Sequence, residues 1–288
     1  MYKIISFGDS FTFGSELQDN DNGSKAWPGL IAKKLKIPYL TLSEPGCGNE
    51  SIARQIYTYF SQNTSDNVLA IINWTWTMRW DFYITTPIKQ IAKRNLVKEN
   101  EYNLIAGSDW PSYHDFCNGM VTSNHIVEDE INNFLNDYNK IENGKWITLG
   151  PTCVPNKLNF LTSEKAQFLI DVYNNFYKDS LLWHRYRSLQ AIFSMQQYLK
   201  NKNIKAIQTY MDYDMLNDEH PDLSPPYVIE LQNSIKNNLM LFDQDKNFLD
   251  WAKSMNFKIT PSPGDHPLEE AHEYAADLYL KKVLEIIQ

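Results

Sequence analysis

Short apolar runs alternate with longer amphipathic segments in the first part of the chain. The runs at residues 3–7, 39–42 and 68–72 have the length of strands, and the last is apolar throughout, as in parallel sheets covered on both faces. Between them, residues 27–35 and 50–61 carry apolar side chains at helical spacing. This alternation predicts βαβ units and a doubly wound parallel sheet with right-handed crossovers.

The alternation stops at about residue 80. Residues 80–180 are polar and rich in asparagine and aromatic residues, with helical patterns at 126–138 and 165–177. Because so many aromatic side chains need burial, we interpret this region as a large, mostly helical or irregular insertion or cap. We expect it to belong to one domain that spans residues 1–288.

The α/β pattern returns in the second half of the chain. It predicts a helix at 180–200, a strand at 204–210, a helix at 248–255 and a short strand at 257–259. Residues 211–238 contain three prolines and are expected to be irregular. We expect the final helix to span residues 267–286, with Pro267 in its first turn and acidic residues beside the positive end of its dipole.

Composition and charge narrow the class of protein. The 43% apolar content can build a full core, and the net charge of −8 comes without any basic block, which argues against a nucleic-acid partner. No run reaches the roughly 18 apolar residues of a membrane span. Three cysteines without CxxC spacing and no recognisable signal peptide predict a cytoplasmic protein with reduced thiols. The oligomeric state stays open.

A reactive serine is indicated at the end of the first strand. Residues 7–14 read Phe-Gly-Asp-Ser-Phe-Thr-Phe-Gly, and α/β folds place reactive groups at the carboxyl ends of strands. Ser10 needs a general base, and His266 near the end of the chain is the best candidate, with His272 as the alternative. Otherwise Ser10 only caps the next helix or closes a turn.

Three blocks together resemble the SGNH (GDSL-type) hydrolase family: residues 7–14, the glycine turn at 44–49 and Asp265-His266-Pro267. The resemblance implies a three-layer α/β/α flavodoxin-like sandwich and ester hydrolysis without a cofactor. It makes Ser10 the nucleophile and His266 the general base. The backbone N–H groups of Ser10 and Gly46 would hold the oxyanion, unless Gly46 is only a turn glycine.

The third block of that family, Gly-x-Asn-Asp, is altered in this chain. Its asparagine, a side-chain donor to the oxyanion, falls on Thr75 by register, whereas the nearest asparagine is Asn73. Both remain candidates. Asn49 is a further candidate donor and substrate-binding residue, or else it caps the second helix.

The acidic member of the triad is also altered, because Pro263 stands where the family has aspartate. Asp265 is next to the histidine, and neighbouring side chains of an extended segment point to opposite faces. The base is therefore oriented either by Asp265, as a triad, or by a backbone carbonyl, as a dyad. We expect Asp9 to fix the serine loop without taking part in proton transfer.

Other residues near the predicted site allow two interpretations each. Arg79 binds an acidic substrate, or it stacks on aromatic side chains or pairs with a structural carboxylate. Trp74, with Trp76 and Trp80, stacks on a sugar ring or packs in the core. We assign no metal, because His114 and its neighbouring acids lack the usual ligand spacing.

The leading functional hypothesis is a serine esterase that acts on a small-molecule or glycan ester, with O-acetyl groups on carbohydrate as one candidate. One alternative is a sugar O-acyltransferase that uses the same serine, which a dry cap would favour. The other alternative is a non-catalytic carbohydrate-binding or structural protein on a degenerate hydrolase scaffold. The altered third block and acid support the latter; intact Ser10, Gly46 and His266 count against it.

Overall fold

The computed structural model describes residues 2–17, 23–63, 65–85, 144–150, 163–212, 215–216, 221–243, 246–261 and 265–288. Its main sheet has four parallel strands in the order β2-β1-β3-β6. These strands are β1 (Lys3–Phe7), β2 (Tyr39–Thr41), β3 (Val68–Trp74) and β6 (Lys205–Tyr210). The order is that of a doubly wound, flavodoxin-like sheet, and the direction of winding changes between β1 and β3.

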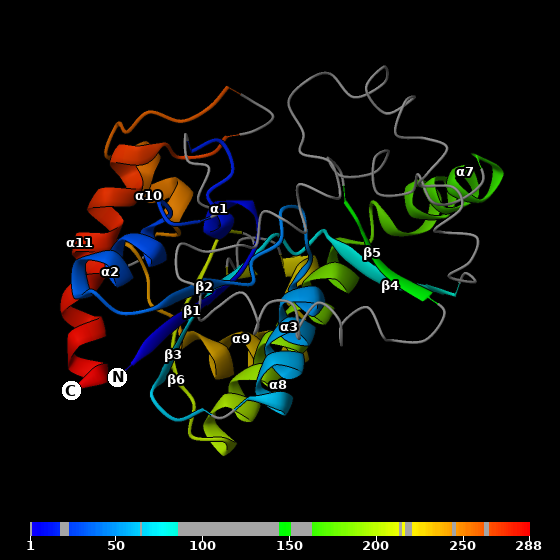
Figure 1. Cartoon of the computed structure of the whole chain (residues 1–288). Helices are drawn as coiled ribbons and strands as arrows, with labels where there is room; N and C mark the ends of the chain where they lie inside the picture. Colours follow the sequence, from blue (N-terminus) through cyan, green and yellow to red (C-terminus); the bar gives the residue numbers. More distant parts are fainter. Residues whose placement is uncertain are drawn as a thin grey trace.

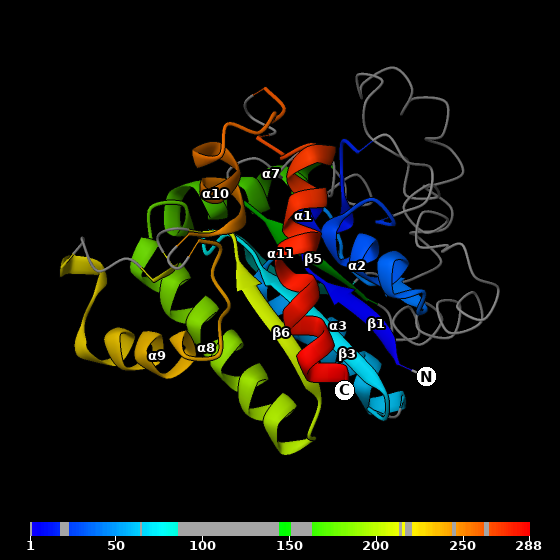
Figure 2. The same cartoon turned by 90° about the vertical axis from the view of Figure 1, so that its left-hand side faces the viewer.

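Helices cover both faces of this sheet (Figures 1 and 2). One face packs against α2 (Trp27–Leu35), α10 (Phe248–Ser254) and α11 (Glu269–Ile287). The other packs against α3 (Asn49–Gln62), α8 (Leu181–Asn201) and α9 (Pro226–Lys236). Alternate side chains of β3 enter the two cores, as the pleat of a strand requires. The predicted three-layer α/β/α sandwich is confirmed.

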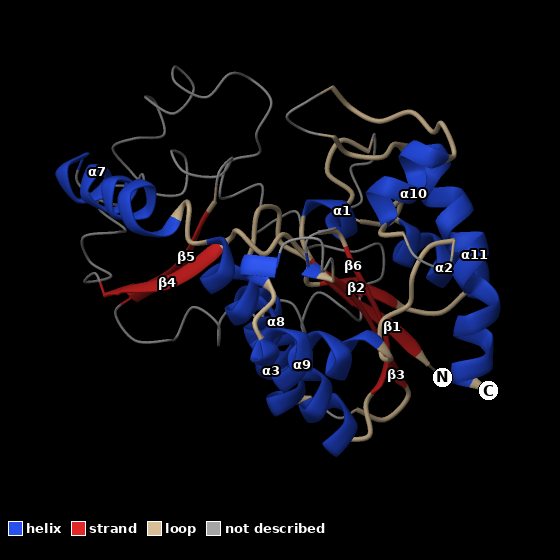
Figure 3. Cartoon of the chain, turned by 180° about the vertical axis from the view of Figure 1, so that it is seen from behind, coloured by secondary structure: helices blue, strands red, loops and turns tan. Residues whose placement is uncertain are grey.

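A second, two-stranded antiparallel sheet follows β3 in the chain (Figures 1 and 3). It pairs β4 (Trp80–Thr85) with β5 (Gly144–Leu149). The helical pattern at 165–177 is confirmed by α7 (Ser163–Val172) and a π-helical turn at Tyr173–Tyr177. The sequence did not predict the strand pair, and the helix expected at 126–138 lies outside the described residues.

Three sequence predictions in the second half of the chain were wrong. The stretch 211–238 is not irregular throughout, because α9 begins at Pro226, a position in the first turn where a missing N–H costs nothing. Residues 257–259 form only one bridge, Ile259 to Pro267. Since Pro267 is held in that bridge and Leu268 N–H donates to the carbonyl of Lys258, α11 begins two residues later than expected.

Both chain ends lie at the amino-terminal edge of the main sheet (Figures 1 and 2). The loops after β1, β2 and β3 therefore meet at the opposite edge, and the winding reverses there between β1 and β3. In open α/β sheets this is where ligands bind. Within the described part of the chain, none of the helices has the length and apolar character needed to cross a membrane.

Candidate active site

Ser10 lies at the start of a single helical turn, α1 (Ser10–Phe13), which follows β1 at the carboxyl edge of the sheet. Asp9 caps this turn: its side chain accepts a hydrogen bond from the N–H of Phe11 (3.1 Å). Gly8 is required just before it, because a Cβ there would lie 2.4 Å from the Thr12 hydroxyl. The Gly-Asp-Ser sequence thus forms a tight strand-to-helix turn.

His266 reaches this turn from the far end of the chain. Its Nε2 lies 2.8 Å from the Oγ of Ser10, across 256 positions of sequence. Two hydrogen bonds to Thr260 hold the histidine: His266 N–H donates to the Thr260 hydroxyl (2.8 Å), and Thr260 N–H donates to the His266 carbonyl (2.9 Å). The ring also packs 4.7 Å from that of Phe11. A hydroxyl and an imidazole within hydrogen-bond distance have the geometry that a nucleophile and its general base require.

Burial lowers the pKa of His266, and the carboxylates of Asp9 and Glu16 partly oppose this. The imidazole is therefore neutral at neutral pH and able to accept a proton. In the tautomer with its proton on Nδ1, Nε2 accepts the hydrogen bond from Ser10.

The glycine turn after β2 lies against the serine loop. Gly8 carbonyl accepts hydrogen bonds from the Glu44 N–H (2.8 Å) and the Cys47 thiol (3.3 Å). Gly46, between these two residues, has a φ of +71°, which favours glycine. In the described residues, neither the Ser10 nor the Gly46 amide donates a hydrogen bond. The first amides of a helix have no internal partner, so Ser10 N–H can serve an external acceptor.

A buried ion pair lies beneath the serine. Asp9 is fully buried, and its Oδ2 accepts from the Thr75 hydroxyl (2.5 Å) and from Arg79 (3.0 Å). Arg79 also donates to the Cys47 carbonyl (2.9 Å) and so links the loops after β1, β2 and β3. Because the Thr75 proton points to Asp9, this hydroxyl is not directed to an oxyanion. Arg79 pairs with a structural carboxylate.

Asn49 and the end of β3 are also occupied by internal contacts. The Asn49 side chain donates to the Thr75 carbonyl (2.9 Å) and accepts from the Thr75 N–H (2.7 Å). Trp74 is fully buried, and its indole N–H donates to Gln208 (3.1 Å). Both side chains hold the fold together and leave no free surface for a substrate.

Asn73 is fully buried, and in the described part of the chain neither of its amide atoms has a hydrogen-bond partner. It alternates with Leu69 and Ile71, whose side chains enter the core beneath α2 and α11. The sequence left the choice between Asn73 and Thr75 open. The Thr75 hydroxyl is engaged by Asp9, and the Asn73 side chain makes no hydrogen bond in the described residues that would decide its role. The backbone amides of Ser10 and Gly46 are further candidate donors, because neither donates a hydrogen bond in the described residues.

The structure does not join Asp265, the predicted acid of a triad, to the histidine. Asp265 makes no hydrogen bond to the imidazole, and His266 Nδ1 has no hydrogen-bond partner in the described residues. Within the described part of the chain, a carboxylate does approach this nitrogen: Oε1 of Glu16 lies 3.9 Å from Nδ1. Sequence reasoning missed Glu16, because nothing in its local pattern shows that the turn after α1 returns to the base.

His272 does not compete with His266. It is buried in α11, and its Nδ1 accepts the N–H of Trp27 (3.1 Å). Burial lowers the pKa of His272 to about 3, so the ring stays neutral with one nitrogen occupied. His114, which the sequence analysis weighed as a possible metal ligand, lies outside the described residues.

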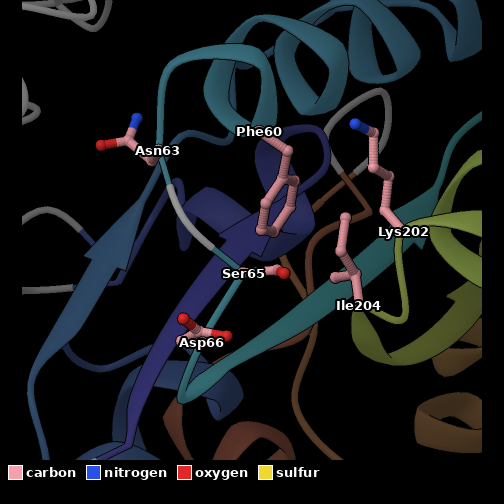
Figure 4. Close-up of a pocket in the computed structure, with 6 residues that line it drawn as sticks. All are labelled: Phe60, Asn63, Ser65, Asp66, Lys202 and Ile204. Carbon is pink, nitrogen blue, oxygen red and sulfur yellow. The ribbon is translucent and has the colours of Figure 1, made fainter.

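A pocket of about 230 Å³ lies at the other edge of the sheet (Figure 4). It is formed where α3 ends and where β3 and β6 begin, and it is lined by Phe60, Asn63, Ser65, Asp66, Lys202 and Ile204. Its position at the amino-terminal ends of the strands separates it from Ser10.

No protein-family model and no curated protein sequence matches this chain. Similar solved structures include the psychrotrophic esterase EstA from Pseudoalteromonas sp. (TM-score 0.45, 11% identity, 99% of this chain and 100% of that one). Others are a member of the lipolytic protein G-D-S-L family from Veillonella parvula (0.38, 13%, 98% and 97%) and a carbohydrate esterase family 2 enzyme from Corynascus thermopiles (0.41, 11%, 99% and 66%). Likeness at this level does not assign an activity to the chain.

Proposed function

We propose that this protein is a serine esterase of the SGNH type, with Ser10 as nucleophile and His266 as general base. One observation carries the proposal: the 2.8 Å contact between Ser10 Oγ and His266 Nε2. The position of the pair at the switch point of the sheet and the unoccupied amides of Ser10 and Gly46 support it.

The first half of the reaction is acylation. Ser10 Oγ forms a bond to the ester carbonyl carbon while its proton passes to His266 Nε2. The electron pair of the carbonyl π bond moves onto oxygen, where the N–H groups of Ser10 and Gly46 donate to it. The intermediate then collapses: the bond to the alcohol oxygen breaks, and the proton on Nε2 moves to the leaving alcohol.

The second half is deacylation by the same route. Water attacks the acyl-enzyme and gives a proton to His266 Nε2, the acyl–Oγ bond breaks, and the proton returns to Ser10 as the acid leaves. We propose a small acyl ester as substrate and would assay acetylated carbohydrates first. Transfer to a sugar would differ only in the hydroxyl that replaces water.

Labelling with a fluorophosphonate, followed by mass spectrometry of the adduct, tests the nucleophile without a known substrate. We expect modification at Ser10, and a loss of at least about 10⁴-fold in labelling rate in Ser10→Ala and His266→Ala. Ser15→Ala is the matched control, because this serine lies in the same turn without a contact to the imidazole, and it should label at the wild-type rate.

Two results would overturn the proposal. One is a folded wild-type protein that is not labelled at Ser10, which would favour the non-catalytic scaffold and make glycan binding the next assay. The other is labelling that survives His266→Ala, which would leave the serine without its assigned base.

A further inference from the structure

His266 Nδ1 lacks a hydrogen-bond acceptor for its proton in the described residues. During acylation His266 becomes an imidazolium, and its Nδ1–H then needs an acceptor in a largely buried site. In the described residues this nitrogen is buried and has no hydrogen-bond partner. A buried donor left unpaired costs about 1–3 kcal/mol, so a nearby carboxylate would lower the barrier.

Among the described residues, three carboxylates act on the pKa of His266, and two of them are unsuited to this role. Asp9 is already engaged: its Oδ1 accepts the Phe11 N–H, and its Oδ2 accepts from Thr75 and Arg79. Asp265 precedes the histidine in a left-handed conformation (φ +50°) and makes no hydrogen bond to the ring. Asp9 cannot turn toward Nδ1 without giving up its contacts, and Asp265 makes no ion pair with the ring in the described residues.

Glu16 has the geometry that the other two lack. Its Oε1 lies 3.9 Å from His266 Nδ1, about 1 Å beyond hydrogen-bond distance. In the described residues it makes no other ion pair or hydrogen bond, and its side chain is 48% exposed, so a change of rotamer can close the gap.

The backbone brings Glu16 back toward the base. Gly14 (φ +78°) ends α1, and Glu16 itself has a φ of +72°, which is uncommon for a residue with a side chain. The turn is held by Ser15 N–H on the Ser10 carbonyl (3.0 Å) and by Leu17, which is buried and donates to the Gly14 carbonyl (3.1 Å). Strained backbone of this kind persists only where packing enforces it, and it gathers at functional sites.

We infer that Glu16 is the positioning residue of the base: its carboxylate accepts the Nδ1–H of His266, orients the ring and stabilises the imidazolium. This rests on the proposed function. No proton moves to Glu16; the Ser10 proton goes to Nε2 and on to the leaving alcohol, while Nδ1 keeps its own. The nucleophile, base and acid of the triad would then be Ser10, His266 and Glu16, with the acid in the first loop of the chain.

The test is the rate of fluorophosphonate labelling at Ser10 as a function of pH in Glu16→Gln. We expect the plateau rate to fall by about 10- to 100-fold, less than the roughly 10⁴-fold of a buried triad acid, because water screens a half-exposed carboxylate. Removing this negative charge also lowers the pKa of His266, so the midpoint of the profile should move to lower pH.

The comparison variants are chosen from the other charged residues near the His266 ring and from one distant carboxylate. Asp9, Arg79, Asp265 and, through α11, His272 also act on His266. Asp265→Asn should slow labelling less than Glu16→Gln; the reverse order would assign the role to Asp265. Glu285→Gln removes the same charge from a similarly exposed position at the end of α11 and should leave rate and midpoint unchanged.

The outcomes separate the inference from the function on which it rests. Wild-type labelling with a Glu16→Gln rate within twofold and an unshifted midpoint overturns the inference and leaves the esterase intact. No wild-type labelling overturns the esterase. Glu16→Asn is a second variant, because asparagine tolerates the positive φ of this position. If Glu16→Gln or Glu16→Asn keeps the wild-type pH profile and melting temperature, Glu16 has no part in positioning the base.

Discussion

Asp9→Asn tests the buried ion pair beneath the serine. Asparagine is nearly the same size and still caps α1 by accepting the Phe11 N–H. Its amide NH2 then replaces the oxygen that accepts from Thr75 and Arg79, so the substitution removes the charge and these two hydrogen bonds. Arg79, whose side chain is only 9% exposed, would be left without its carboxylate. Breaking one partner of a buried pair typically costs about 3–5 kcal/mol, and we expect that loss in the free energy of unfolding.

The assay is urea unfolding of the single variants Asp9→Asn and Arg79→Met and of the double variant. The double variant should be more stable than the sum of the two single losses predicts, because it leaves no unpaired charge; the coupling should be at least about 1.5 kcal/mol. A single-variant loss below about 1 kcal/mol, or additive losses, would refute the reasoning and show that water reaches the pair. Wild-type m-values in all variants would show that the unfolded state is unchanged.

Three further predictions concern His266, His272 and Thr75. Since burial lowers the pKa of His266, Ser10 labelling should be half-maximal below pH 6.5 and fall as the base is protonated at lower pH; a midpoint above 7 contradicts this. Because the pKa of His272 is about 3 in the folded protein, its neutral ring contributes to the free energy of unfolding fully above pH 6.5, and this contribution is lost as the pH falls from there toward 3. Urea unfolding should therefore show that wild type loses about 1 kcal/mol more stability than His272→Asn when the pH is lowered from 7.5 to 5.5. Thr75→Val removes the hydroxyl that donates to Asp9 and accepts from Arg79, and it should lower the free energy of unfolding by about 1–3 kcal/mol. Thr75→Ser keeps a hydroxyl and should retain most of this stability. Equal stability of the two variants would count against the role of the hydroxyl.

The main sheet was predictable because its signals are local. The run at 68–72 is apolar on both faces, and β3 is indeed covered by helices on both sides. Residues 257–259 were predicted as a short strand from two apolar residues around Lys258, yet they form one bridge, from Ile259 to Pro267. Periodicity reports burial, and it does not report which partner a segment finds.

The candidate site divides in the same way. Ser10 and His266 stand out in sequence because each needs a particular type of residue in a tight turn, and the structure brings them together. The contact of Glu16 depends on two positive φ angles and on packing of the turn, which leave no periodic trace. Likewise Asn49, expected as a donor or a cap, forms two hydrogen bonds with the Thr75 backbone. This contact joins the start of α3 to the loop after β3, and it depends on the order of strands in the sheet.

The 256 positions between Ser10 and His266, the proposed nucleophile and base, have a consequence for synthesis of the chain. At the usual pace of translation, about 5–20 residues per second, the serine emerges roughly ten to fifty seconds before the histidine that activates it. Through this interval the nascent chain carries only an ordinary hydroxyl, with no base to raise its reactivity. A ribosome-bound chain stalled before residue 266 should therefore be inert to fluorophosphonate, and reactivity should begin only when the segment that carries His266 closes on the first helix.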